Sequence, residues 1–239
     1  MTRLSLSILG LVLAGAAQAQ CTKPLYLTLD TGDMRHAALI AQTLDKHGVR
    51  ATFFLANEKT FRGDHALEAS WADYWKARAA EGHAFGSHTW RHWYFRRDVD
   101  AGRVAYVSGD GSRREALDQD GVCREIARVD EAFKAMTGRG LAPLWRAPGG
   151  RTTPRTLEYA QACGFRHVGW SPAGFLGDEL PSERYPNQVL LNKALVEVRA
   201  GDILMMHLGI RSRREPFAPM LDPLLAGLKA RGFCFETLN

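Results

Sequence analysis

Several kinds of segment are missing from this sequence of 239 residues. After residue 20 it has no apolar run long enough to span a bilayer, no internal repeat and no low-complexity tract. No Pro-, Gly- or Ser-rich linker divides the chain. These absences argue against a disordered chain, collagen-like repeats and a coiled coil, and they favour one continuous domain with a hydrophobic core.

Charge of one sign is not in large excess, and cysteines are few. The chain has 31 Lys and Arg against 26 Asp and Glu, a net charge of +5. This balance mildly favours acidic partners, but it does not choose between nucleic acid, membrane and acidic glycan. None of the four cysteines forms a CxxC pair, so a zinc site built from thiolates is poorly supported.

The N-terminus carries the pattern of an export signal. A basic start, Met1-Thr2-Arg3, precedes an apolar run from Leu4 to Ala14 and the small-x-small sequence Ala17-Gln18-Ala19. The run is too short for a good membrane span, so residues 1–19 are predicted to be a cleaved signal peptide. We expect a periplasmic or secreted domain of residues 20–239, without stable membrane insertion and without a nucleic-acid partner.

Export changes the interpretation of the cysteines, because an oxidising compartment favours disulfides. Four cysteines allow three pairings, and the sequence alone does not choose among them. We favour Cys21–Cys234, which would tie the two ends of the mature chain, together with Cys123–Cys163. The alternative leaves two buried thiols unpaired.

Apolar runs typical of strands alternate with helical patterns along the mature chain. The strand candidates are residues 24–30, 51–56, 83–88, 142–146, 166–171, 202–207 and 233–238. The helix candidates are residues 36–47, 66–80, 118–137, 153–163, 187–199 and 219–229. This alternation predicts parallel β/α units, arranged either as a barrel or as an open doubly wound sheet.

Polar side chains stand at or just past the carboxyl ends of the strand candidates. They are Asp30, His88, Arg146, Ser171 and His207. A β/α barrel gathers chemistry from many strand ends on one face, whereas an open sheet gathers it near one switch point. The pattern therefore favours a barrel.

Two short motifs carry candidate chemistry. His88 and His92 form an HxxxH, which on a helix or helical turn brings both imidazoles to one metal ion. Thr89 stands where the zinc peptidase motif needs its glutamate base, so a metallopeptidase is disfavoured. Asp30 and Asp33 flank a Thr-Gly pair, which is either a plain turn or a source of a base and an oxygen ligand.

Taken together and in this order, the motifs resemble the NodB-like polysaccharide deacetylases, carbohydrate esterase family four. Residues 27–32 (LTLDTG) are similar to the first family motif, and residues 82–92 (GHAFGSHTWRH) to the second. Residues 145–150 (WRAPGG) resemble the third, and residues 203–207 (ILMMH) the last. The resemblance extends over about residues 25–238 and implies a distorted seven-stranded β/α barrel in a single domain.

The resemblance also implies a reaction and a set of roles. It implies a hydrolase of carbon–nitrogen bonds other than peptide bonds, which removes N-acetyl or O-acetyl groups from an acetylated glycan. A divalent metal ion, expected to be Zn²⁺, would be held by His88 and His92. Asp30 would be the general base, Arg146 would orient it, and His207 would be the general acid.

The first motif departs from the family pattern. Thr31 stands where the family has a second aspartate as metal ligand. Asp33 is predicted to substitute for it, although Asp30 itself or water could fill the site. A backbone N–H near Thr31 or Gly32 is expected to help hold the oxyanion.

The fourth motif departs too, because it keeps Trp170 but lacks the usual acids. Asp178 is a candidate partner for His207, although a plain loop residue is the favoured interpretation. Trp90, Trp93 and Trp170 are predicted to contact substrate, with core packing as the alternative for the first two. Two other functions stay open: a same-fold hydrolase of a non-sugar amide, and a glycan-binding protein with a degenerate metal site. The sequence does not determine the oligomeric state.

Overall fold

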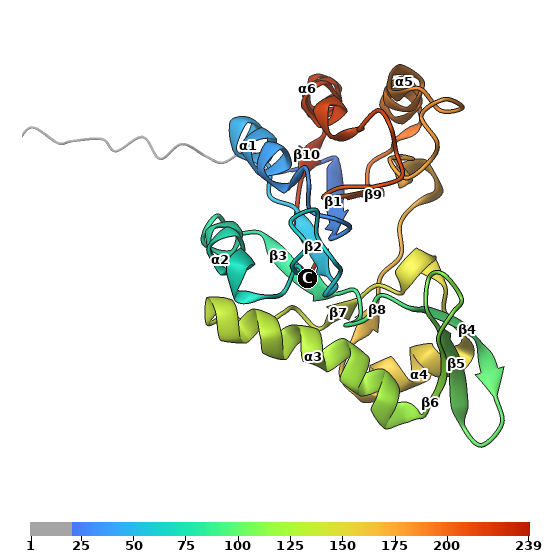
Figure 1. The fold of residues 1–239 in the computed structure, drawn as a ribbon. Helices are drawn as coiled ribbons and strands as arrows, with labels where there is room; N and C mark the ends of the chain where they lie inside the picture. Colours follow the sequence, from blue (N-terminus) through green and yellow to red (C-terminus); the bar gives the residue numbers. More distant parts are fainter. Residues whose placement is uncertain (1–20) are drawn as a thin grey trace, which may run out of the picture.

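The computed structural model describes residues 21–239, so the predicted signal peptide lies outside the described residues. A seven-stranded parallel sheet curls through the molecule (Figure 1). Six of its strands follow the order β10-β1-β2-β3-β7-β8, and the seventh, β9, pairs with β1 on the side opposite β2. Its strands are β1 (Pro24–Asp30), β2 (Thr52–Leu55), β3 (Ala84–Ser87), β7 (Leu144–Trp145), β8 (Arg166–His167), β9 (Ile203–His207) and β10 (Cys234–Phe235). The predicted distorted β/α barrel in one domain is confirmed.

The barrel is distorted where β8 and β9 face each other. Instead of pairing directly, they are bridged by residues 171–176. Ser171 N donates to Ile203 O over 3.1 Å, and Leu176 N donates to Met205 O over 3.3 Å. Because this segment is irregular, the strand predicted over 166–171 is shortened to β8, and the sheet is closed by loop backbone on that side.

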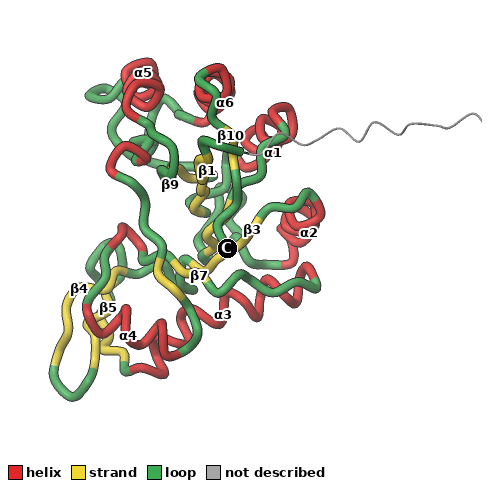
Figure 2. The backbone as a smooth tube through the Cα atoms, turned by 180° about the vertical axis from the view of Figure 1, so that it is seen from behind, coloured by secondary structure: helices red, strands yellow, loops and turns green. Residues whose placement is uncertain are grey.

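Helices cover the outside of the sheet (Figures 1 and 2). They are α1 (Ala37–His47), α2 (Ala72–Ala80), α3 (Gln119–Thr137), α4 (Pro154–Ala162), α5 (Asn187–Glu197) and α6 (Leu221–Ala230), with 3-10 turns η1 (Ala69–Trp71), η2 (Pro148–Gly150), η3 (Pro172–Gly174) and η4 (Ala218–Met220). Within residues 21–239, no helix is both long and apolar enough to cross a membrane.

Local signals set where these helices begin and end. The Asp118 side chain accepts a hydrogen bond from Gly121 N over 2.8 Å, which satisfies a free N–H at the start of α3. Thr153 caps α4 with its side chain, and Pro154 occupies the first turn. Gly48 ends α1 with a φ of 57°, a left-handed conformation that glycine adopts without a side-chain clash.

The main core lies between the strands and helices α1, α2, α3, α5 and α6. On β1 and β2 every second residue contributes to this core, so one face of each strand is apolar, while the opposite face of β1 carries Thr28 and Asp30. Leu27, Leu29 and Phe53 are fully buried there. This packing holds the ends of the central strands in place, so the polar residues that follow those ends also have fixed positions.

A second sheet was not predicted from the sequence. It is antiparallel and three-stranded, with β4 (Tyr94–Val99), β5 (Arg103–Val107) and β6 (Arg114–Leu117) in consecutive order. Figure 1 shows it beside α4, away from the barrel strands β1 and β2. The β4–β5 hairpin turns through residues 100–102, where Ala101 and Gly102 adopt left-handed conformations with φ values of 54° and 68°. The many charged residues of this segment hide the alternation that marks its strands.

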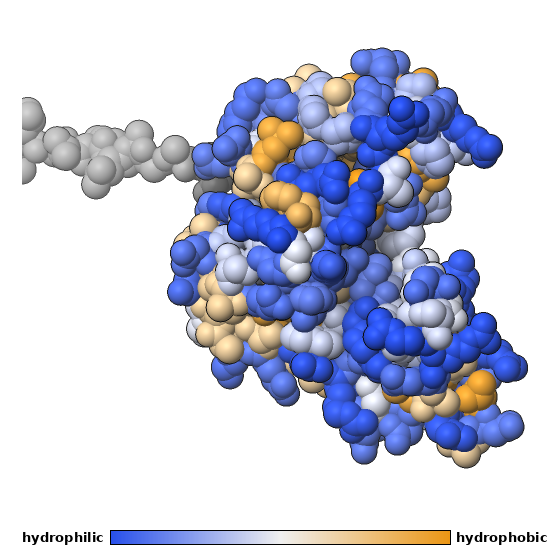
Figure 3. Space-filling view, in the orientation of Figure 1, coloured by the Kyte–Doolittle hydropathy of each residue, from blue (hydrophilic) through white to orange (hydrophobic). Residues whose placement is uncertain are grey.

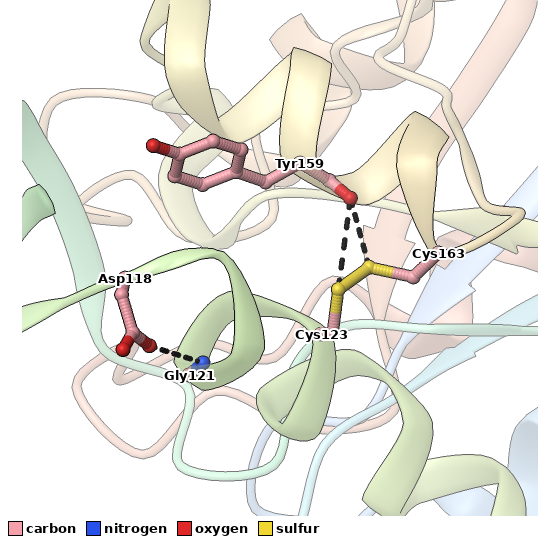
Figure 4. Close-up of a disulfide and its surroundings, with 5 residues drawn as sticks. All are labelled: Asp118, Gly121, Cys123, Tyr159 and Cys163. Atoms are coloured by element: carbon pink, nitrogen blue, oxygen red, sulfur yellow. Dashed lines mark hydrogen bonds between the residues drawn. A yellow bond between two sulfur atoms is a disulfide. The ribbon is translucent and has the colours of Figure 1, made fainter. Parts of the chain in front are cut away.

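The structure forms both favoured disulfides. Cys21 is bonded to Cys234, so the start of the described chain is joined to β10. Cys123 is bonded to Cys163, which joins the first turn of α3 to the end of α4 (Figure 4). The described residues contain no free cysteine.

The two disulfides should stabilise the fold by different amounts, because they close loops of different length. The bonded residues are 213 positions apart in the first pair and 40 in the second. Loop-closure entropy then predicts that the C21S/C234S variant loses about 1.5 kcal/mol more free energy of unfolding than C123S/C163S. Denaturant unfolding of both variants measures this difference, and the reverse order would contradict it.

Candidate active site

Strand register brings the predicted polar residues to one level of the barrel. Asp30 pairs with His207 across β1 and β9, and Ser87 pairs with Trp145 across β3 and β7. His88 and Arg146 each follow one residue after the latter pair. The carboxyl ends of four strands therefore deliver their side chains to the same face, as the barrel prediction requires.

Asp30 and Arg146 form a buried ion pair, with exposed fractions of 2% and 0%. Arg146 Nη1 donates to Asp30 Oδ1 over 2.8 Å and to Thr28 Oγ1 over 2.8 Å. Arg146 Nε and Nη2 donate to the carbonyls of Val168 and Gly169 over 3.1 and 2.8 Å. Burial alone would raise the pKa of Asp30, but the Arg146 guanidinium together with His88 and His207 outweighs it and holds the pKa below its usual value.

The two histidines do not lie on a helix. Residues 88–93 form an irregular loop after β3, in which Thr89 and His92 adopt left-handed backbone conformations with φ of 65° and 54°. Such residues store strain that neighbouring contacts must offset. Glu125 of α3 supplies those contacts: its Oε2 accepts from Arg91 N over 3.0 Å, its Oε1 from Arg91 Nε over 2.6 Å, and its carbonyl from Trp90 N over 2.8 Å.

The loop turns the Nε2 atoms of His88 and His92 toward each other, 3.1 Å apart. His88 Nδ1 faces the carbonyl oxygen of Arg146 at 2.9 Å, and His92 Nδ1 faces Glu58 Oε1 at 3.3 Å. Both partners are acceptors, so a neutral ring at either position carries its proton on Nδ1 and a lone pair on Nε2. Burial also lowers the pKa of His88 to about 4, which keeps that ring neutral.

Two lone pairs that face each other at this distance fit a shared cation. Nitrogen ligands at 2.0–2.1 Å from a tetrahedral zinc ion stand about 3.3 Å apart, close to the observed separation. The other oxygen of Asp30, Oδ2, lies 3.4 Å from His88 Nε2. In residues 21–239, however, no group of three or more His, Cys, Asp or Glu side chains is arranged to hold a metal ion. The fit thus rests on the two imidazoles.

Glu58 is a site residue that the sequence reasoning missed. Its Oε2 accepts hydrogen bonds from Thr31 Oγ1 and Gly32 N, both over 2.8 Å. Burial would raise its pKa, but His92, His88 and the Thr31 hydroxyl lower it below the usual value. The one available signal was its position three residues past β2, beside the strand that carries Asp30.

Asp33, the predicted third ligand, turns away from the histidines. Its Oδ2 accepts from Arg35 Nε over 2.7 Å, and its Oδ1 accepts from Arg35 N over 3.2 Å. Arg35 is only two positions away in the chain, so it pairs with the Asp33 carboxylate more readily than a ligand site across the barrel does. The structure therefore brings Glu58, rather than Asp33, to the paired imidazoles.

The backbone N–H groups expected at the oxyanion are already engaged. Thr31 N donates to Phe54 O over 3.2 Å as part of the sheet, and Gly32 N donates to Glu58. Gly32 itself is required here, because a Cβ would stand 2.2 Å from the carbonyl oxygen of Gly209. The turn after β1 thus serves as an anchor for Glu58 rather than as an open oxyanion hole.

His207 is held by Asp178, which is not the plain loop residue favoured from the sequence. Asp178 is 4% exposed, and its Oδ2 accepts from His207 N over 2.7 Å while its Oδ1 lies 3.1 Å from His207 Nδ1. Burial would lower the pKa of His207, but Asp178, with smaller contributions from Asp30 and Glu179, outweighs it and raises the pKa to about 10. This imidazole is therefore charged at neutral pH and can give up a proton.

A cleft of about 870 Å³ opens beside His92, within the size range of ligand sites. Its walls include Glu58, His92, Trp90, Trp93, Arg113 and Arg211. Figure 3 shows a largely hydrophilic surface with a notch between the part over α5 and β9 and the part over the β4–β6 sheet.

The three predicted tryptophans differ in what they contact. Trp90 and Trp93 line the cleft, yet Trp93 is only 5% exposed and packs on Tyr106. Trp170 stacks on Phe175 with ring centroids 6.3 Å apart and lies against Gly150. Packing thus accounts for much of the area of Trp93 and Trp170, and Trp90 is the more accessible of the two cleft tryptophans.

Loss of the Glu125 carboxylate should loosen the histidine loop. In the Glu125→Ala variant, Arg91 N and the Tyr106 hydroxyl lose a buried acceptor, so the free energy of unfolding should fall by about 2 kcal/mol. Urea unfolding measures the loss, with Glu131→Ala on the exposed face of α3 as the matched control. Equal stabilities for the two variants would contradict this account of the loop.

Comparisons with known proteins agree with the family resemblance of the sequence motifs. A family model described as polysaccharide deacetylase matches residues 17–168. The peptidoglycan-N-acetylglucosamine deacetylase of Bacillus cereus is 26% identical over 214 residues, which cover 89% of this chain and 66% of that protein. The chitooligosaccharide deacetylase of Azorhizobium caulinodans is 26% identical over 241 residues, which cover 95% of this chain and 99% of that protein.

Solved structures share the fold. A peptidoglycan N-acetylglucosamine deacetylase superposes with a TM-score of 0.69 and 23% identity, covering 92% of this chain and 88% of that one. A family 4 acetyl xylan esterase from Clostridium thermocellum, solved with a cobalt ion, superposes with a TM-score of 0.68 and 22% identity, covering 90% of this chain and 88% of that one. A CE4 family pseudoenzyme from Bacillus anthracis gives 0.67 and 18%, covering 90% and 64%.

Proposed function

The chain belongs to the polysaccharide deacetylase family, a family of carbohydrate-deacetylating hydrolases, and on that premise we propose that it is an active, metal-dependent and exported member. One observation carries this proposal. The buried Asp30–Arg146 pair stands beside two imidazoles whose Nε2 atoms converge, with a charged His207 on the neighbouring strand. This arrangement supports a base, a cation site and an acid on one face.

The residues divide the hydrolysis of an acetamide between them. His88 and His92 would hold a divalent ion, which when bound supplies a Lewis acid that acidifies water and polarises the acetyl carbonyl. Asp30 Oδ2 takes the proton of the attacking water, while Arg146 keeps Asp30 ionised through Oδ1. His207 gives its proton to the leaving nitrogen, so water and acetamide become acetate and a free amine.

The substrate proposed is a polymer that contains N-acetylglucosamine, with O-acetyl groups as a second choice. The named activities of the two curated relatives support it, since both act on such sugars. The volume of the cleft beside His92 supports a substrate larger than a lone acetyl group. Together with the predicted signal peptide, this points to a substrate in the periplasm or outside the cell.

A glycan-binding protein without catalysis is the competing function, and one structural neighbour is a pseudoenzyme. Thr31 in place of the family aspartate favours it. The energetic cost of the site argues against it. Burying an ion pair and an imidazolium lowers the stability of the fold, and catalysis would account for that cost whereas glycan binding would not. A pure binding site has no need of a base held below and an acid held above their usual pKa values.

Acetate release from N-acetylglucosamine oligomers tests the proposal. The purified mature protein should release acetate, lose activity on chelation and regain it on addition of Zn²⁺ or Co²⁺. Asp30→Asn should lower kcat about a thousandfold, because it removes the base. Glu197→Gln, an exposed carboxylate of α5, should keep full activity.

Two results would count against the proposed reaction. Glycan binding without acetate release would favour the binding protein, and release from a non-sugar acetamide alone would favour the other amide hydrolase.

The pH profile should expose the role of Asp178. His207 must be protonated to act as the acid, so activity should fall as pH rises through its pKa of about 10. In Asp178→Asn the carboxylate that raises this pKa is gone while burial still lowers it, so the alkaline limb of kcat/KM should move down by more than about one pH unit. Exposed Glu183→Gln serves as control, and an unmoved limb would exclude His207 as the acid.

A further inference from the structure

The first motif has Thr31 in place of the family carboxylate, and a carboxylate from the loop after another strand lies beside it. Glu58 follows β2, whose Phe54 pairs with Asp30 of β1. The Thr31 hydroxyl and the Gly32 N–H, which belong to the turn where the family has its aspartate, both donate to Glu58 Oε2. The Thr31 hydroxyl also accepts from Ala56 N over 3.1 Å, which fixes its orientation toward Glu58.

The second oxygen of Glu58 faces His92. Glu58 Oε1 lies 3.3 Å from His92 Nδ1. A carboxylate behind a metal-binding imidazole fixes the tautomer and the ring orientation and makes the opposite nitrogen a better ligand. Here that opposite nitrogen is the Nε2 that faces His88.

Charge balance distinguishes Glu58 from the other acids of the site. Asp30 is neutralised by Arg146, and Asp33 by Arg35. Among the described residues, no lysine or arginine forms an ion pair with Glu58, whose carboxylate faces the His92 ring instead. Glu58 therefore supplies the negative charge that remains to compensate a divalent cation between two neutral imidazoles.

We propose that Glu58 is the positioning carboxylate of the metal centre, anchored by Thr31 and acting through His92 in place of the absent aspartate. This inference rests on the proposed metal site at His88 and His92. It explains how the first motif can lack an acid and still form the site. The Thr31 hydroxyl, which replaces that acid, donates a hydrogen bond to the carboxylate of Glu58 from the loop after β2.

Metal titration of the mature apo-protein tests the proposal without any substrate. Calorimetry with Zn²⁺ should give a dissociation constant 10–100-fold weaker for Glu58→Gln than for the wild type. The visible absorption of bound Co²⁺ should also change, because the His92 ring loses its fixed orientation. The apo-protein should unfold at nearly the same temperature as the wild type, which a merely structural role would not predict.

A second variant relocates the carboxylate. Thr31→Asp added to Glu58→Gln places an acid at the family position, and it should recover at least about tenfold of the lost Zn²⁺ affinity. Asp33→Asn is the matched control from the same turn, and its affinity should equal that of the wild type because Arg35 holds this carboxylate. Glu58→Asp, which keeps the charge, replaces Glu58→Gln if the latter does not fold.

The outcomes separate this inference from the proposed reaction. Unchanged Zn²⁺ affinity and an unchanged Co²⁺ spectrum in the Glu58 variants would overturn it, as would a wild type that binds neither ion. A Glu58-dependent Zn²⁺ site in a protein that releases no acetate would refute the reaction and leave the inference standing.

Discussion

A buried ion pair between Asp30 and Arg146 organises the active face of this protein. Removing both charges from water is costly, and the cost is offset only because Arg146 also donates to Thr28 and to the carbonyls of Val168 and Gly169. Those partners sit on or beside two distant strands, so the pair forms only when the barrel has closed in the observed register. Once formed, it leaves Asp30 Oδ2 aimed at His88.

Around that pair, three carboxylates take different roles because each has a different partner. An arginine keeps Asp30 ionised, as a base requires, and an imidazole ring held by Asp178 stays protonated, as an acid requires. Glu58 contacts Thr31 and His92, which directs its charge to the paired imidazoles. In the proposed mechanism, one face of the barrel thus separates base, acid and cation site by environment rather than by residue type.

Much of the fold could be predicted, since strand and helix patterns are local in the chain and each strand of the barrel falls inside a predicted range. The β4–β6 sheet could not, because its strands carry charged residues on the exposed face and draw their burial from α3 and α4. The HxxxH spacing identified His88 and His92, but it did not indicate the irregular loop. Glu125, 33 or more positions away in the chain, holds that loop in its left-handed turns.

The order of motifs along the chain was sufficient to propose Asp30, His88, His92, Arg146 and His207 as candidate site residues, and all of them except His92 directly follow or end a strand. The choice among the remaining acids was made by packing. Asp33 lies two residues from Arg35 and is captured locally, whereas Glu58 is 27 residues from Thr31 and reaches it through the pairing of β1 with β2. Spacing in a sequence reports local neighbours, and a partner that arrives from an adjacent strand is visible only when the sheet is assembled.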